Sequence, residues 1–163
     1  MDRLISSGYR EAITLAQRRM PTNIWRRVRH AGIVCGLDPA FIGLYGQSMD
    51  LDAAATTYFR HLTGDQSTTI VVAPLDDRWV LDNLPYVMAH EYGHVLHETL
   101  RWCWSAGAIS EYAETNEYEA FAEAFAYHLG FTRKERNGKR VPWKFSPDLA
   151  TVALFRTLAR VTA

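Results

Sequence analysis

Three residues in the segment HEYGH, residues 90–94, have the types and spacing needed to bind a metal ion and activate water. In an α-helix, residues four apart lie on one face, about 6 Å apart along the axis. His90 and His94 can therefore bind one ion from the same face of a helix. Glu91 lies about 100° further around, where it can reach a water on the metal. The pattern predicts a zinc site with Glu91 as the general base.

The neighbouring residues favour this interpretation over a histidine-rich, solvated helix face. Apolar residues gather on the side opposite His90 and His94, so that the helix can pack on a core while presenting its histidines. These residues are Met88, Tyr92, Val95, Leu96 and Leu100. His97 continues the histidine stripe by one turn, and we expect it to lie beyond the ligands or at the surface.

A hydrolytic zinc site usually has three protein ligands and one open position. A metzincin would need Gly at position 97 and His at position 100, but His97 and Leu100 stand there, which excludes that class. The next candidates are the glutamates of ETNEYEAFAEAFAYHLG, residues 114–130.

Helical periodicity separates these glutamates. One stripe of mostly small residues consists of Glu119, Ala122, Glu123, Ala126 and Gly130. Such a stripe lets a second helix approach the histidine helix closely. We expect Glu119 to be the third ligand and Glu123 to orient a zinc-bound histidine through its other ring nitrogen. Glu117 lies nearly opposite Glu119 and would be the ligand only if the register moved by two residues.

HEYGH followed by EAFAEAFA, residues 119–126, resembles the gluzincin metallopeptidases, the thermolysin-type group. Their third ligand is the Glu of an E-x-x-A-(D/N/E)-x-x-A helix. Glu119, Ala122, Glu123 and Ala126 match that form, with Glu123 where Asp or Asn is commoner. Within the group, the segment is most similar to compact ImmA/IrrE-like peptidases of phages and mobile elements. The resemblance covers residues 86–130.

The resemblance implies a zincin-like fold, one Zn²⁺ per chain and zinc metalloendopeptidase activity on a protein or peptide. Family members often carry a helix-turn-helix domain. No convincing helix-turn-helix pattern is recognised in the sequence, so a repressor-cleaving role is not expected from the resemblance.

Other parts of the site are less defined by sequence. A further donor should stabilise the oxyanion, and the candidates are His97, Tyr112, Tyr127 and His128. The segment TTIVVAPL, residues 68–75, can either pair with an extended substrate beside the cleft or form an internal core strand.

Two other functions agree with parts of the sequence. Peptide deformylases pair this histidine motif with an upstream Cys, and Cys35 stands upstream, but their flanking residues are missing here. Cys35 is better interpreted as a small buried residue near a helix end. The second alternative is a zinc-containing binding or anti-defence module that acts on a protein or nucleic-acid partner without proteolysis. Glu91 argues against it, since a purely structural site needs no base.

The expected elements make an α+β protein with a small antiparallel sheet packed on helices. Thr22 or Asn23 caps the second helix, and Asp82 caps the histidine helix with Pro85 in its first turn. Ser146 and Pro147 open the last helix. Helices are predicted over 9–20, 24–36, 82–101, 116–130 and 148–161, strands over 40–46, 55–62 and 68–75, and a basic hairpin over 133–140.

Composition limits the function classes further. The chain has 163 residues, with 18 basic and 18 acidic side chains, so its zero net charge argues against nucleic-acid binding. We expect one domain over 1–163, with N-terminal helices in 1–36, the catalytic core in 40–130 and the hairpin and last helix in 131–163. No transmembrane run or signal-peptide h-region is present, so a cytoplasmic protein with no membrane contact is expected. The oligomeric state is left open.

Overall fold

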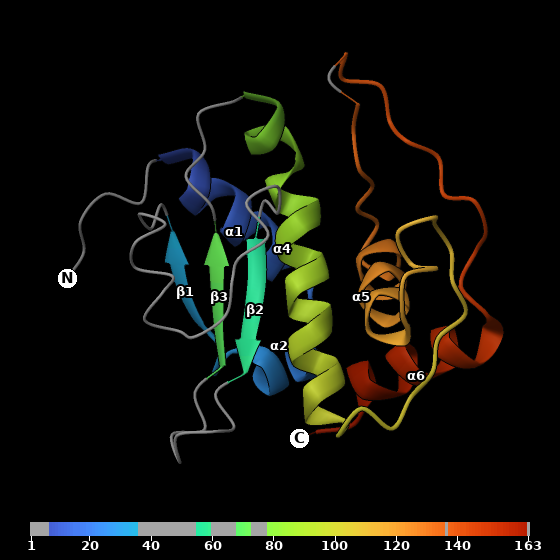
Figure 1. Cartoon of the computed structure of the whole chain (residues 1–163). Coiled ribbons are helices and arrows are strands. Elements are labelled where there is room, and N and C mark those ends of the chain that lie inside the picture. Colours follow the sequence, from blue (N-terminus) through green and yellow to red (C-terminus); the bar gives the residue numbers. More distant parts are fainter. Residues whose placement is uncertain (1–6, 36–54, 60–67, 73–77, 136, 163) are drawn as a thin grey trace.

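The computed structural model describes residues 7–35, 55–59, 68–72, 78–135 and 137–162 (Figure 1). Helices and strands are both present in this part of the chain, which confirms the α+β prediction. The helices are α1 (Ser7–Arg19), α2 (Thr22–Val28), α4 (Arg78–Thr99), α5 (Glu117–His128) and α6 (Leu149–Arg160). The strands are β1 (Gly32–Cys35), β2 (Ala55–Phe59) and β3 (Thr68–Val72).

The three described strands form one sheet in the order β1-β3-β2. Strand β3 is central and pairs antiparallel with β2, so that Ile70 lies opposite Thr57. On its other side, Ile70 pairs with Ile33 of β1, and this pair is parallel. The sheet is therefore mixed, and the prediction of a wholly antiparallel sheet is wrong, although the pairing of the predicted strands over 55–62 and 68–75 is antiparallel as expected. The predicted strand over 40–46 and the turn TGDQ lie outside the described residues.

The parallel strand comes from a segment that the sequence assigned to a helix. The helix predicted over 24–36 ends at Val28, and Gly32–Cys35 is β1. Ile33 is β-branched and suits a strand, while the open edge of β3 supplies the hydrogen-bonding partner. The predicted cap is also wrong, since Pro21 holds the cap position without a side-chain hydrogen bond.

Helix α4 begins earlier than predicted. Arg78 is its first residue, so Asp82 lies in the second turn rather than at the cap, and Pro85 lies inside the helix. A proline there removes one backbone N–H from the ladder. The helix ends at Thr99, close to the predicted end. Arg101 and Trp102 then take left-handed backbone angles, with φ of 55° and 56°, which turn the chain away from the helix axis.

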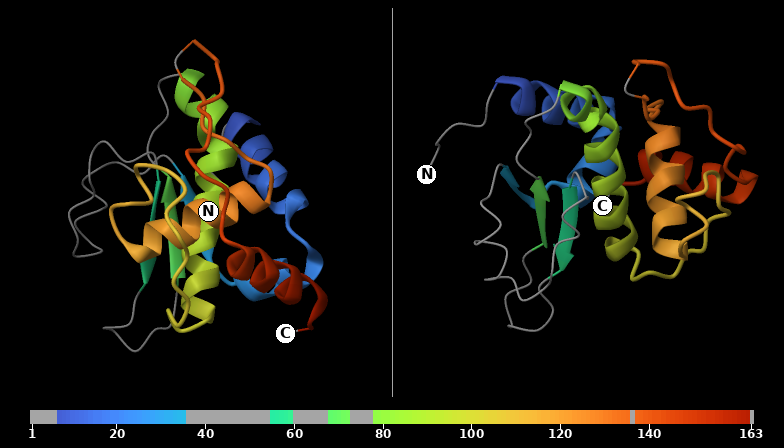
Figure 2. Two further views of the ribbon diagram at one scale, coloured as in Figure 1. Left: turned by 90° about the vertical axis from the view of Figure 1, so that its right-hand side faces the viewer. Right: turned by 45° about the horizontal axis from the view of Figure 1, so that its top comes forward.

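Helix α4 lies between the sheet and the pair α5 and α6, with α1 and α2 packed against it (Figures 1 and 2). It is therefore covered on both sides, which explains why its apolar residues are not confined to one face. Fully buried aromatic side chains around it come from three helices: Tyr92 in α4, Phe121 and Phe125 in α5, and Phe155 in α6. No helix in the described ranges has the length and apolar character to cross a bilayer.

Helix α5 matches its prediction at both ends. The side chain of Asn116 accepts hydrogen bonds from the backbone N–H groups of Tyr118 and Glu119, which caps the first turn. Gly130, with φ of +75°, takes the left-handed conformation that ends the helix. Arg19 of α1 donates to the carbonyls of Leu129 and Gly130, and so ties this end to the N-terminal helices.

The C-terminal part wraps back onto α4. Lys134 and Arg140 form an antiparallel bridge, as expected for the basic hairpin. Asn83 of α4 clamps the backbone of Lys134, because its side chain accepts from the N–H (2.6 Å) and donates to the carbonyl (3.1 Å). Helix α6 is capped by Asp148, two residues after the predicted opening at Ser146.

Candidate metal centre

The site lies where α4 and α5 approach each other most tightly. A Cβ added at Gly93 would be 2.7 Å from Cα of Ala122, so any larger residue at that position would push the two helices apart. Ala122 belongs to the small-residue stripe of α5, together with Glu119 and Glu123. The absence of side-chain bulk on both helices therefore brings the carboxylates of α5 to the histidines of α4.

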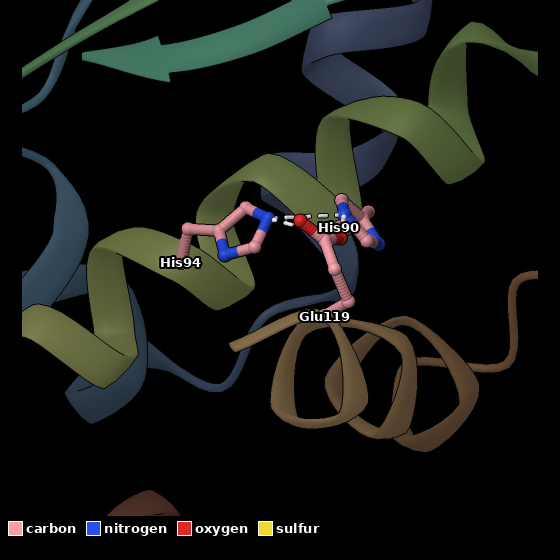
Figure 3. A group of neighbouring side chains, drawn as sticks. All are labelled: His90, His94 and Glu119. Carbon is pink, nitrogen blue, oxygen red and sulfur yellow. Dashed lines mark hydrogen bonds and ion pairs between the residues drawn. The ribbon is translucent and has the colours of Figure 1, made fainter. Parts of the chain in front are cut away.

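Three candidate ligand atoms converge at this crossing (Figure 3). Oε2 of Glu119 lies 2.9 Å from Nε2 of His90 and 3.5 Å from Nε2 of His94. The two Nε2 atoms are 3.1 Å apart. The structure thus brings together the three residues that the sequence singled out as ligands, and they could hold a metal ion.

The geometry and the donor set both suit zinc. Ligands at about 2.0–2.1 Å from a tetrahedral zinc are about 3.3 Å from one another, close to the spacings at this site. Oε2 of Glu119 is buried, and within the described part of the chain it has no hydrogen-bond donor at a favourable angle. Two histidines and one carboxylate are the ligand set of known catalytic zinc sites. A cation that took the place of the proton between these atoms would be coordinated by Oε2 of Glu119 and by the Nε2 atoms of both histidines.

The electrostatics of the cluster also favour a cation. Burial alone would lower the pKa of His90, but Glu119 and Glu123 outweigh it and raise that pKa to about 10. Burial would raise the pKa of Glu119, but its contacts with His90 and His94 outweigh this and hold the pKa well below its usual range. The same negative potential that retains a proton on His90 would attract a metal ion.

A second carboxylate orients His90 from the other side. Oε1 of Glu123 lies 3.0 Å from Nδ1 of His90 and also accepts a hydrogen bond from the hydroxyl of Tyr86. Oε2 of Glu123 accepts from Ser110 at 2.8 Å. Because a carboxylate only accepts, Nδ1 of His90 carries the hydrogen, which leaves the Nε2 lone pair of the neutral ring for a metal.

Glu91 is buried beside this cluster. Its Oε2 accepts a hydrogen bond of 2.6 Å from the hydroxyl of Thr57 in β2. Burial is the main cause of the raised pKa of Tyr112, whereas it opposes the rise in the pKa of His90, which comes mainly from Glu119 and Glu123. The negative charge of Glu91 adds to the rise in both pKa values. The carboxylate therefore lies close to the ligands without being one of the three.

The structure places His97 in different surroundings. Its ring is fully buried and stacks on Phe121, with ring centres 4.2 Å apart. Nε2 donates to the carbonyl of Trp104 at 2.8 Å, and burial lowers the pKa of the ring. Nδ1 has no hydrogen-bond partner among the residues that the structure describes. His97 is thus apart from the three candidate ligands, and packing explains its position.

Of the oxyanion candidates, Tyr112 lies nearest the site. Its ring centre is 5.7 Å from that of His90, and about half of the side chain is exposed. Burial, together with the charges of Glu119 and Glu91, raises the pKa of its hydroxyl, which therefore stays protonated as a donor. Tyr127 instead packs on Trp143, and His128 packs on Phe155.

Strand β2 borders the candidate site through Thr57, whereas the segment considered from sequence, residues 68–75, contains β3. Strand β3 is paired on both sides, whereas β2 is at an edge among the described strands and carries Thr57. Thr57, Tyr86 and Ser110 were missed, since a hydroxyl residue distant in sequence carries no local signal of its partner. Cys35 is the last residue of β1, not a residue at a helix end.

Comparison with protein-family models, curated proteins and solved structures found no match to this chain.

Proposed function

We propose that this protein is a zinc metallopeptidase of the gluzincin type, with a zincin-like fold. His90, His94 and Glu119 would hold one zinc ion, and Glu91 would be the general base. The observation that carries the proposal is the convergence of three ligand atoms at the α4–α5 crossing, with a buried carboxylate one residue from a ligand. The compact ImmA/IrrE-like peptidases of phages and mobile elements remain the resemblance that best suits these motifs.

The chemistry divides among the residues. When bound, zinc lowers the pKa of a coordinated water to near neutral and polarises a carbonyl. Glu91 takes the proton from the attacking water and returns it to the leaving amide nitrogen. Glu123 holds the ring of His90 through Nδ1, with its own position fixed by Tyr86 and Ser110.

Tyr112 is the residue best placed to donate a hydrogen bond to the developing oxyanion. It is partly exposed, close to His90 and protonated at neutral pH, whereas Tyr127 lies two helical turns beyond Glu119. A substrate would be a protein or peptide chain, because the general base and the oxyanion donor together suit amide hydrolysis.

The direct test is metal analysis combined with peptide hydrolysis. The purified chain should hold about one zinc and cleave members of a fluorescence-quenched random peptide library, with products identified by mass spectrometry. Glu91→Gln should reduce cleavage by roughly 10²- to 10⁴-fold and retain zinc, because general-base catalysis contributes that much.

Matched glutamate variants test the ligand assignment. Glu119→Ala should lose zinc, while Glu117→Ala, at an exposed position two residues earlier on the same helix, should keep it. If Glu91→Gln cleaves as fast as the wild type, the mechanism is wrong. A chain that binds zinc but cleaves nothing would favour a non-proteolytic binding module.

A further inference from the structure

In the described part of the chain, the buried Glu91 carboxylate accepts a hydrogen bond from the sheet. The hydroxyl of Thr57 lies 2.6 Å from Oε2 of Glu91 and 3.3 Å from the backbone carbonyl of the same residue. The shorter contact is in the range of a hydroxyl that donates to a charged oxygen. Because a hydroxyl has one hydrogen, the carboxylate is its principal acceptor.

Thr57 is held in place by regular structure. Its backbone pairs with Ile70 in the antiparallel ladder between β2 and β3, and β-branching restricts rotation of its side chain. The donor therefore stands on a rigid strand, 34 positions from Glu91 in sequence. A mobile loop would not fix the direction of the carboxylate in this way.

The contact affects only one of the two carboxylate oxygens. A carboxylate turns readily about its terminal torsion, so a bond at Oε2 also fixes the direction of the other oxygen. Removing that bond would leave the carboxylate close to the site but free to rotate. Catalytic geometry is sensitive to such changes, since misplacement by about 1 Å can cost roughly 100-fold in rate.

We propose that Thr57 is a positioning residue, which holds Oε2 of Glu91 so that the second oxygen faces the attacking water. This inference rests on the proposed peptidase function. The described contacts of the Thr57 hydroxyl are with Glu91 and not with a candidate ligand, so Thr57 acts through Glu91.

The experiment uses the full chain purified with zinc and compares Thr57→Val, which keeps the shape but lacks the hydroxyl, with Thr57→Ser, which retains it. With a quenched peptide selected from the library, Thr57→Val should lower kcat by roughly 10- to 100-fold, with KM within about twofold. Thr57→Ser should recover most of kcat. Zinc affinity should be the same in both variants, because the ligands are untouched.

A double-mutant cycle with Glu91→Ala supplies a readout that does not depend on activity. Thr57→Val should lower Tm by roughly 3 to 12 °C in the parent chain, since the lost hydrogen bond is to a charged group. In the Glu91→Ala background the same substitution should shift Tm far less. Equal shifts in both backgrounds would overturn the proposal.

The outcomes separate the two proposals. If the wild type cleaves and Thr57→Val has an unchanged kcat, or Thr57→Ser fails to restore it, the role of Thr57 is wrong and the peptidase function stands. If the wild type cleaves nothing, the peptidase function and the positioning role both fail. Coupling in Tm would then still establish the Thr57–Glu91 contact as a structural one.

Discussion

Helices α4 and α5 form two neighbouring environments that differ sharply although both contain histidine. Around His90 and His94, α5 supplies the carboxylates of Glu119 and Glu123. One turn further along α4, α5 supplies Phe121, on which His97 stacks. The first environment raises the pKa of His90 to about 10, and the second lowers that of His97.

The helix that faces a histidine therefore determines whether that histidine can bind a metal ion or only packs in the core. Carboxylates stabilise a positive charge at the imidazole and suit a metal ion, while an apolar surrounding disfavours any charge. His97 keeps its ring neutral and uses Nε2 to bind the carbonyl of Trp104. Regular spacing along α4 alone would group all three histidines, but α5 divides them.

The largest expected effect is on zinc affinity, which a substitution at His94 should lower and a substitution at His97 should not. His94→Ala should weaken zinc binding by on the order of 10³-fold, because it removes one of three protein ligands. His97→Phe should change affinity by less than about threefold, since aromatic stacking on Phe121 is retained. Competition with a chromophoric chelator measures both.

His97→Phe also has a structural cost that marks its role. The carbonyl of Trp104 loses its donor, so the free energy of unfolding should fall by about 1–3 kcal/mol. A loss of zinc in His97→Phe comparable to that in His94→Ala would contradict the separate roles of these two histidines.

The next effect is the pH dependence of zinc binding. In the metal-free protein the pKa of His90 is raised to about 10, so a zinc ion must displace a proton at neutral pH. Affinity should rise by up to about tenfold per pH unit until pH approaches 10. Titrations with competing chelators from pH 6.5 to 9.5 would measure this slope. A flat profile over that range would mean that His90 is already neutral.

The same pKa shift predicts how the free energy of unfolding of the metal-free chain changes with pH. In the folded chain the pKa of His90 is higher than its ordinary value of 6.5. The stabilisation that protonated His90 contributes to the fold is therefore fully present below about pH 6.5. That contribution is lost as pH rises through about 10. Chemical unfolding of the chelator-treated protein should show this decline, and His97→Phe should show the same one.

The smallest effect concerns the packing that joins the two environments. Gly93→Ala places a Cβ against the backbone of Ala122, so α4 and α5 must move apart, at a cost of about 1–3 kcal/mol. This lowers Tm by roughly 2–12 °C. Gly107→Ala, where the nearest atom is 3.7 Å away, is the matched control and should have little effect. Ala122→Gly should not rescue Gly93→Ala, because the contact is with Cα.

Much of the candidate site could be predicted because it depends on local periodicity. The spacing of His90 and His94 places them on one helical face whatever the fold, and the stripe on α5 singled out Glu119 over Glu117. Asn116 and Gly130 set the ends of α5 through local hydrogen bonding and backbone freedom. The contact between Thr57 and Glu91 could not be predicted, since it joins a strand to a helix across the fold.

Local chemistry in the chain was sufficient for the helical spacing of the candidate ligands, for the extent of α5 and for the small-residue stripe that lets α5 approach α4. Tertiary structure alone decided that residues 32–35 form a strand, because the edge of β3 offers hydrogen bonds that compete with a helix. It also decided that His97 faces Phe121 rather than a carboxylate. The physical reason is the same in both cases. The local sequence allows more than one conformation or environment, and the element that packs against the segment determines which one forms.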